Sequence, residues 1–403
     1  MRRGLRSGPA VMPRSGDLLL LSRSGYDAAG VDSAIRAVFG HFGGIGRFVR
    51  PGSRVLLKVN LVAGHPPERR VTTDPEIVRA VARQVLSAGG RPFIADSPGI
   101  DAFVPAAERA GFMDVARELG IPCVELTDPV PLPPAPDALF RRIEVSRLVL
   151  EADTVINLPK MKTHGQMLLT LGVKNLFGCI VSRRKASWHY DVGLSRERFA
   201  GLLLDLWAGI APALTILDGI VGMDGAGPTS GRPFPYGIVA AAEDALALDF
   251  QLCRMMGASL EDFPLWLAAK KRGLPQCGPN GSTLAGDFPS SHTFPGTDIP
   301  APRSLRLLPR LPFARLWERA LTSRPVHVPS LCIGCGRCEA VCAAGALKHA
   351  DRTLRFNYRR CIRCYCCHEM CPVRAIAFRE SPLVRLLRGA ENLASRLTRL
   401  RGR

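Results

Sequence analysis

The feature that most constrains this chain is a duplicated cysteine array near its C-terminus. The stretches CIGCGRCEAVC and CIRCYCCHEMCP share the spacing C-x2-C-x2-C-x3-C. Their cysteines are Cys332, Cys335, Cys338 and Cys342, followed by Cys361, Cys364, Cys367 and Cys371. Each cysteine of the first stretch recurs 29 residues later, which indicates an internal duplication. Three closely spaced thiolates suit three corners of an iron–sulfur cubane, with a fourth ligand from elsewhere in the chain.

The array resembles a bacterial-type 2[4Fe-4S] ferredoxin domain, in which the fourth cysteine of each run serves the other cluster. The resemblance implies two [4Fe-4S] clusters that carry single electrons. It implies that Cys332, Cys335, Cys338 and Cys371 hold one cluster, and that Cys361, Cys364, Cys367 and Cys342 hold the other. Pro372 follows the second run, whereas Ala343 follows the first, a departure that removes no ligand. Cys366 is an extra thiol, either a bystander or a substitute ligand.

Two other uses of cysteine fit this spacing less well. Structural zinc favours two separated C-x2-C pairs, and disulfides require an oxidising compartment that nothing else in the sequence indicates. No apolar run approaches the ~20 residues of a membrane-spanning helix, and DLLLLS is too short for the core of a signal peptide. We therefore expect a cytoplasmic protein whose residues 1–16 form a flexible tail.

Positive charge is concentrated in the last quarter of the chain. The net charge is +19, and residues 301–403 contribute 21 Arg and Lys against 6 Asp and Glu, or +15. Solvated surface arginine, docking to an acidic redox partner protein and contact with a membrane surface all fit this pattern. Nucleic-acid binding is disfavoured because stacking aromatic residues are sparse there.

From residue 17 to about 300, strand and helix patterns alternate. Strands are predicted at 54–60, 91–99, 122–126, 153–159, 213–219 and 236–242. A helix is predicted within 72–90, with a capping box from Thr73 and Glu76 and a stop at Gly89–Gly90, and another at 106–120. This order predicts an α/β fold, a parallel or mixed sheet covered by helices.

The predicted organisation has five parts. Residues 1–16 are the tail, 17–300 the α/β domain and 301–325 a linker. Residues 326–380 are a small α+β ferredoxin-like domain with two clusters, and 381–403 a basic amphipathic helix.

Polar side chains follow several predicted strands, where ligands bind in open α/β sheets. The candidate ligand-binding residues are Lys58, Asn60, Asp96, Asn157 and Asn175. The candidate catalytic residues are Lys160, Lys162, His164, Lys174 and Asp218. Several lysines beside an imidazole suit a carboxylate or phosphate, so we expect a small anionic ligand. For Lys174, an ion pair with an aspartate is an equally open interpretation.

Six sequence blocks in order resemble the DUF362 family over residues 54–250. They are KVNLV, TTDPEIVRAVARQVLSAGG, ADSPG, INLPKMKTHGQMLLTLGVKNLFGCI, ILDGIVGMDGAGPTSG and AAEDALALD. The resemblance also covers Asp74, His189 and Asp249, and it implies a ferredoxin-type domain behind the α/β region. It brings no catalytic assignment. The glycine loop after Asp218 matches neither the Walker nor the dinucleotide pattern, so neither ATP nor NAD is predicted.

Two functions remain open from the sequence. The first is an iron–sulfur oxidoreductase whose α/β domain binds a small anion while the clusters supply or remove electrons. The second is a non-catalytic electron-transfer or accessory module that docks on a partner enzyme.

Overall fold

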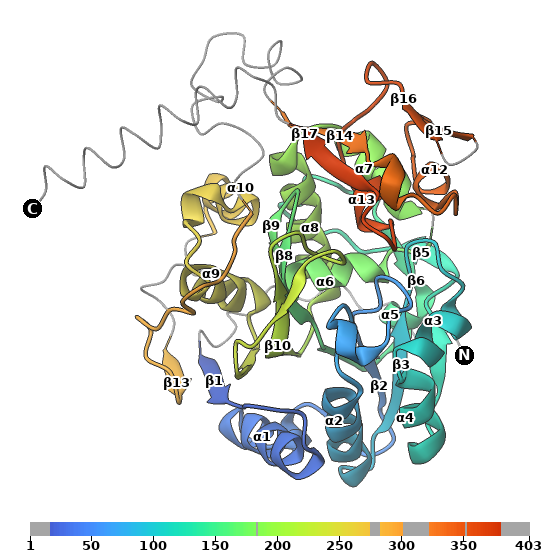
Figure 1. The fold of residues 1–403 in the computed structure, drawn as a ribbon. Coiled ribbons are helices and arrows are strands. Elements are labelled where there is room, and N and C mark those ends of the chain that lie inside the picture. The colour runs from blue at the N-terminus through green and yellow to red at the C-terminus, as the bar shows by residue number, and fades with distance from the viewer. Residues whose placement is uncertain (1–16, 183, 275–282, 301–321, 351–352, 380–403) are drawn as a thin grey trace, which may run out of the picture. The chain divides into compact units, whose positions relative to one another are not determined.

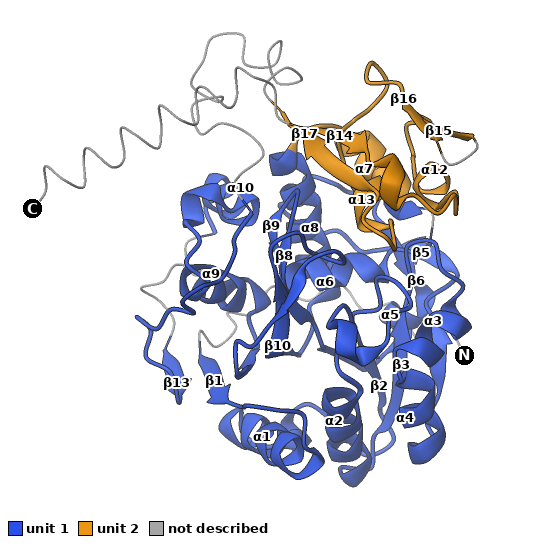
Figure 2. Ribbon diagram, viewed as in Figure 1, with its two compact units in different colours: residues 1–185, 196–300 blue, residues 186–195, 301–403 orange. Residues whose placement is uncertain are grey.

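The computed structural model describes residues 17–182, 184–274, 283–300, 322–350 and 353–379. The chain divides into two compact units, shown in Figure 2. Unit 1 comprises residues 1–185 and 196–300, and unit 2 comprises residues 186–195 and 301–403. The predicted tail (1–16), most of the predicted linker (301–321) and the predicted C-terminal helix (381–403) lie outside the described residues.

Unit 1 is built on a mixed sheet with eleven strands among the described residues (Figure 1). The order along the sheet is β13 (Leu284–Gly286), β1 (Leu18–Ser22), β12 (Ile238–Ala242), β10 (Leu214–Asp224), β7 (Thr154–Asn157), β2 (Arg54–Lys58), β3 (Arg91–Asp96) and β4 (Cys123–Glu125). The short strands β8 (Lys160–His164), β9 (Leu168–Thr170) and β11 (Arg232–Phe234) extend it beside β10. Because β12 runs antiparallel to β1 and β10 while the β10–β7–β2–β3–β4 pairs are parallel, the sheet is mixed, as predicted.

Helices cover both faces of this sheet. The helices of one face are α1 (Ala28–His41), α2 (Pro75–Ser87), α3 (Phe103–Arg109) and α4 (Phe112–Leu119). Their apolar side chains form one core with alternate strand residues such as Val55, Leu57 and Val239. The intervening Leu56 and Ala240 are also fully buried and point to the other face, where α9 (Ala245–Met255) packs on β12. Each fully buried Val or Leu contributes ~1.5–3 kcal/mol.

The remaining described helices and strands of the α/β region are short or lie outside the sheet. They are β5 (Pro129–Pro131), β6 (Glu144–Ser146), α5 (Arg147–Glu151), α6 (Gly172–Asn175), α7 (Arg184–Val192), α8 (Arg196–Ile210) and α10 (Pro264–Lys271). Among the described residues, no helix combines the length and the apolar character needed to cross a membrane.

The start of α2 differs from the predicted capping box. Asp74 is the N-cap, because its side chain accepts a hydrogen bond from Glu76 N and Pro75 occupies the first helical position. The hydroxyl of Thr73 instead accepts from Asn60 N and donates to Leu158 O, which ties the helix start to the ends of neighbouring strands. The helix ends at Ser87, and Gly89 follows with a φ of 75°.

The single helix predicted at 106–120 is wrong. Two helices, α3 and α4, replace it and meet at Gly111, which has a φ of 78°. An L-residue rarely adopts this left-handed conformation, and a helix cannot continue through it.

The segment after β7 forms a further strand. Leu158 and Pro159 interrupt the chain, Asp218 N donates to Pro159 O, and β8 then pairs in parallel with β10 from Lys160 onward. A tight hairpin joins β8 to β9, with His164 opposite Leu168. The interruption places the basic residues of β8 beyond the carboxyl ends of β2 and β7.

Unit 2 repeats the 29-residue offset of its cysteines in its secondary structure. The strand β14 (Arg324–His327) corresponds to β16 (Thr353–Phe356), β15 (Leu347–Ala350) to β17 (Ile376–Arg379), and the helix α12 (Arg337–Ala340) to α13 (Cys366–Glu369). Both strand pairs join the two halves: β14 pairs with β17, and β15 pairs with β16. The two halves therefore share one fold.

The duplication extends to backbone conformation. Gly334, Gly336 and Gly345 have positive φ angles, and so do Arg363, Tyr365 and Arg374, each 29 residues later. The first half places glycine at these left-handed positions, whereas the second half holds L-residues in a conformation they rarely adopt. Each of these positions therefore has a left-handed backbone because the fold of the half requires it, whichever residue occupies the position.

Candidate functional site

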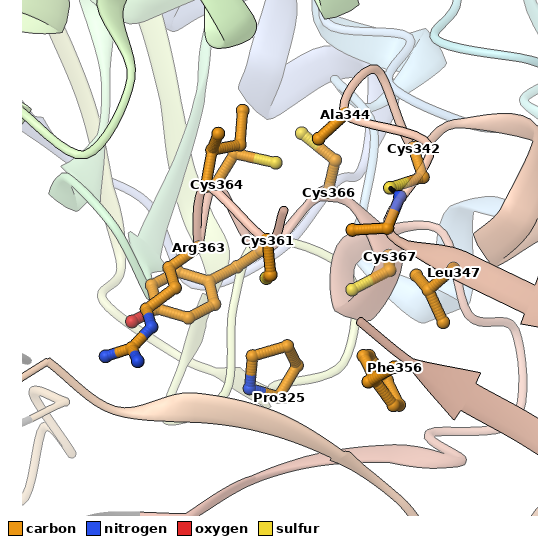
Figure 3. A pocket seen from close by; sticks show the side chains of 13 residues that line it. Pro325, Cys342, Ala344, Leu347, Phe356, Cys361, Arg363, Cys364, Cys366 and Cys367 are labelled. Carbon is orange, nitrogen blue, oxygen red and sulfur yellow. Dashed lines mark hydrogen bonds between the residues drawn. The ribbon is translucent and has the colours of Figure 1, made fainter. Parts of the chain in front are cut away.

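A cavity in unit 2 brings together cysteines from both halves of the duplication. It is lined by Cys342 from the first run and by Cys361, Cys364 and Cys367 from the second. Figure 3 shows these side chains around one space, with Leu347 and Phe356 beside them. This grouping is the ligand set that the ferredoxin resemblance implies for one of the two clusters.

Three cysteines of the other predicted set, Cys335, Cys338 and Cys371, lie near one another. Burial raises the pKa of the Cys338 thiol to about 11; the backbone N–H of Glu339 opposes this rise, and the nearby Cys371 and Cys335 add to it. Two backbone amides donate to sulfur at equivalent places, Ala346 N to Cys342 Sγ at 3.2 Å and Ala375 N to Cys371 Sγ at 3.1 Å.

The donor set in unit 2 fits an iron–sulfur cluster. Four thiols, an apolar wall and N–H donors to sulfur are the protein contributions that such clusters use. Iron binding would displace the protons that burial holds on the thiols of Cys338 and Cys367. A bound cluster would supply one-electron transfer.

Cys366 lines the same cavity but belongs to neither predicted ligand set. It is buried, and its thiol hydrogen-bonds the Cys364 sulfur, which lowers the pKa of Cys364 and raises that of Cys366. This contact is consistent with Cys366 as a donor to a ligand sulfur.

In unit 1, Lys58 and Asp96 form a buried ion pair at the carboxyl ends of β2 and β3. Lys58 Nζ lies 2.9 Å from Asp96 Oδ1, and both side chains are less than 5% exposed. Lys58 also donates to Val59 O at 2.7 Å, and Asp96 Oδ2 accepts from Leu61 N. Gly178 packs directly against this pair: a Cβ there would lie 2.6 Å from Lys58 Nζ and closer still to Asp96 Oδ1.

A chain of amides links the predicted ligand-binding residues. Lys162 Nζ donates to Asn60 Oδ1 at 2.7 Å, and Asn60 Nδ2 donates to Asn175 Oδ1 at 2.9 Å. Asn175 Nδ2 in turn donates to Asn157 Oδ1 at 2.9 Å, and Asn157 Nδ2 donates to Gly172 O. The structure thus brings Asn60, Asn157, Asn175 and Lys162 into one network.

The third network centres on Lys160 and Asp218. Lys160 Nζ donates to Asp218 Oδ2 and to Tyr26 Oη, both at 2.7 Å, and Tyr26 donates to Asp218 Oδ1 at 2.7 Å. Burial lowers the pKa of Lys160, and the charge of Asp218 opposes this. Burial and the Asp218 charge raise the pKa of Tyr26 above its ordinary value. Asp74 N also donates to Asp218 Oδ2, at 2.8 Å.

His164 lies at the opposite end of β8 from Lys160, and Lys174 lies beside Asn175 on α6. His164 closes the β8–β9 hairpin, where its Nδ1 accepts from Gln166 N at 3.0 Å and Met167 N at 3.2 Å. Neutral His164 therefore carries its proton on Nε2. Lys174 is half-buried on α6, whose first amides are held by the Asp249 carboxylate.

Tyr26 and Gly178 are not among the site residues predicted from the sequence. Tyr26 follows β1, so the rule that polar residues cluster at strand ends applies to it as well. Gly178 carried no signal of its own, because its role depends on which side chains pack against it. The aspartates of these networks do not build a metal centre: in the part of the chain that is described, no three His, Cys, Asp or Glu side chains are placed to hold a single metal ion.

One prediction follows from Asp74, whose carboxylate contacts Arg70 at 2.7 Å and caps α2. Burial, followed by the charge of Asp218, raises the pKa of Asp74 from 3.8 to about 6. The folded chain therefore keeps this proton to a higher pH than the unfolded chain. Its stabilising contribution is complete below about pH 4 and is lost as the pH rises through about 6.

Asparagine is an equally good N-cap but does not titrate. Relative to the wild type, Asp74→Asn should therefore gain stability between pH 4 and pH 6.5, by about 2–3 kcal/mol at most. Urea unfolding of both proteins across this range measures the difference. If the free energies of unfolding of the two proteins differ by the same amount at every pH in this range, the prediction is wrong.

Comparisons with known proteins agree with both parts of the chain. A family model described as "Domain of unknown function (DUF362)" matches residues 55–254, and one described as "4Fe-4S dicluster domain" matches residues 331–376. The "Thylakoid-associated protein sll1697" of Synechocystis is 40% identical over 279 residues, which cover 68% of this chain and 83% of that protein. Among solved structures, the lactate racemase apoprotein of Thermoanaerobacterium thermosaccharolyticum aligns with a TM-score of 0.38 at 12% identity. That alignment covers 59% of this chain and 56% of the racemase chain.

Proposed function

The chain belongs to the DUF362 family and carries a ferredoxin-type 4Fe-4S domain, and from this premise we propose that it couples electron transfer to ligand binding. In this proposal, two [4Fe-4S] clusters in unit 2 move electrons one at a time. Unit 1 binds a small anionic ligand, and the whole is a redox enzyme.

The observation that carries the proposal is the cavity lined by Cys342, Cys361, Cys364 and Cys367. A cysteine from one run meets three from the other, which is how two-cluster ferredoxins exchange their fourth ligand. The equivalent N–H···S contacts at Cys342 and Cys371 support a second cluster in the other half.

The ligand-binding part rests on the polar networks at the carboxyl edge of the sheet. Lys58, Lys160 and Lys162 are each less than 2% exposed, and each is held by several polar partners. Asp96 and Asp218 neutralise two of these lysines, so an anionic ligand would compete with the carboxylates for them. Reorganisation of such pairs is a means of coupling ligand binding to proton movement.

The alternative is a non-catalytic electron-transfer or accessory module that docks on a partner enzyme. Leu331 and Ile333 flank Cys332 and are 47% and 55% exposed, and Cys335 is exposed as well. Together with the basic charge of residues 301–403, these side chains suit contact with an acidic partner protein. The expected compartment is the cytoplasm. Peripheral membrane contact is compatible with the name of the thylakoid-associated relative. Cell fractionation at low and high salt tests both locations, the cytoplasm and the membrane surface.

Anaerobic purification followed by iron and acid-labile sulfide analysis tests the cluster proposal. Two clusters require about eight iron atoms and eight sulfides per chain, with EPR signals that appear on reduction. A protein that holds zinc and no sulfide would overturn it.

A thermal-shift screen of small carboxylates and phosphates tests the ligand proposal. A ligand at 100 times its Kd stabilises the folded chain by about 2.7 kcal/mol, which is a measurable rise in Tm. The rise should be lost in Lys162→Met and kept in Lys270→Met, because Lys270 is exposed on α10. If no anion shifts the Tm of the loaded protein, unit 1 is not a site for small anions.

A further inference from the structure

The two halves of the unit 2 repeat differ in how their cysteines are covered. In the second half, the side chains of Tyr358, Arg363 and Tyr365 donate to main-chain carbonyls of residues 322–325. We call residues 322–325 the strap. The two tyrosine hydroxyls lie 2.9 Å and 2.8 Å from the carbonyl oxygens that they bond. Because Pro325 of the strap lines the cysteine cavity (Figure 3), these bonds hold one wall of that cavity in place.

The first half cannot make the same bonds. The residues that stand 29 positions before the three strap donors are Pro329, Gly334 and Gly336. None of these residues has a side chain that can donate a hydrogen bond. The side chains that hold the strap are therefore a property of the second half alone.

Apolar side chains are exposed beside the cysteines of the first half. Leu331 is 47% exposed and Ile333 is 55% exposed, and Cys335 is exposed as well. At the equivalent positions of the second half, Ile362 and Cys364 are partly buried and both line the cavity. The duplication thus provides an internal comparison, in which one set of cysteines is enclosed and the other reaches the surface.

The described part of unit 2 is also basic. Residues 322–350 and 353–379 contain nine Arg and Lys against two acidic residues, Glu339 and Glu369, a net charge of +7. Bound clusters would be anionic and would offset part of this charge, whereas an acidic partner surface complements the rest. The two exposed apolar side chains supply the contact area that desolvates when a partner docks.

We propose that the chain exchanges electrons with an acidic redox protein at the first half of unit 2, where Leu331, Ile333 and Cys335 form the docking face. The strap keeps the partner away from the cysteine cavity of the second half. One electron moves in each encounter: the donor loses it, the acceptor gains it, and no covalent bond forms or breaks. The inference rests on the proposed pair of clusters and adds which of them meets the partner.

EPR power saturation of the full, cluster-loaded and reduced chain tests which cysteine set is accessible. The probe is chromium(III) tris-oxalate, an anionic paramagnetic complex that speeds the relaxation of centres it can approach. The two reduced centres of the unmutated chain should respond unequally. The centre that remains in Cys342→Ser, which keeps the first set intact, should relax faster with the probe than the centre that remains in Cys371→Ser. Equal responses, or the reverse order, would overturn the proposal.

Stopped-flow oxidation of the reduced chain tests the docking face. The probes are an anionic oxidant, tris(oxalato)cobaltate(III), and a cationic one, hexaamminecobalt(III). At low salt, Ile333→Glu should slow oxidation by the anion by about tenfold and speed oxidation by the cation, because the added charge lies at the face that both probes approach. Leu331→Glu should act in the same way and replaces Ile333→Glu if that variant loses iron.

Leu267→Glu is the matched control, because Leu267 is 43% exposed on α10 of unit 1. It should leave both oxidation rates unchanged. Rates in Ile333→Glu and Leu331→Glu that equal those of the control would overturn the proposal. Iron and sulfide are counted before each measurement. A chain without eight of each overturns the cluster proposal and this inference with it, whereas a fully loaded chain with two equally accessible centres overturns this inference alone.

Discussion

Replacing Cys342 with serine should remove about half of the bound iron. Cys342 lines the same cavity as Cys361, Cys364 and Cys367, so its loss leaves that cluster with three cysteine ligands. The other set does not include it. Iron and sulfide content should fall from about eight of each per chain to about four, and one of two EPR-active centres should disappear or change its spectrum.

Cys366→Ala is the matched control. Cys366 lines the same cavity and is more deeply buried than Cys342, but the ferredoxin pattern does not use it as a ligand. This variant should keep its full iron content. The potential of its cluster should shift, because the hydrogen bond to the Cys364 sulfur is gone. Equal iron loss in the two variants would mean that Cys366 is a ligand and that the exchanged pairing is wrong.

Gly178→Ala should cause a large loss of stability in unit 1. The added Cβ would lie 2.6 Å from Lys58 Nζ and closer to Asp96 Oδ1, and both charged side chains are buried. Separating a buried ion pair leaves uncompensated charge, which costs about 3–5 kcal/mol. Denaturant unfolding of the full chain should show the transition of unit 1 at a clearly lower denaturant concentration than in the wild type.

Gly40→Ala is the matched control, for which we expect a slight gain in stability rather than a loss. Gly40 lies on the exposed side of α1, and a Cβ there would have no neighbour within 4 Å. Alanine in a helix is favoured over glycine by about 0.5–1 kcal/mol, so this variant should be slightly more stable than the wild type. If Gly178→Ala unfolds at the same denaturant concentration as Gly40→Ala, the packing at Lys58 and Asp96 does not determine the stability of unit 1.

The sequence predicted those features of the molecule that depend on local spacing. The C-x2-C-x2-C-x3-C runs predicted a duplicated small domain because the ligand geometry of a cluster dictates that spacing. Alternating strand and helix patterns predicted the covered mixed sheet, and parallel strands bring Lys58, Asp96 and Asn157 to one edge.

The features that the sequence did not predict depend on contacts between distant residues or on single backbone angles. Tyr26 joins Asp218 across 192 residues, and no local pattern near either residue indicates the other. The N-cap of α2 is Asp74 rather than Thr73 because the Thr73 hydroxyl bonds two strand-end backbone groups that only the folded sheet provides. The break at Gly111 is a single left-handed residue within an otherwise helical pattern.

The 29-residue duplication in unit 2 has a consequence for how the clusters are loaded. In the proposed ligand sets, neither half of the repeat holds all four ligands of one cluster. An isolated half would therefore have to meet another half-domain before a cluster could have its four ligands. Joining the halves in one chain converts that encounter into an intramolecular one, with an effective concentration in the millimolar range for a short connection. Loading should therefore be independent of protein concentration, even at the low copy numbers at which a dimer of half-domains would dissociate.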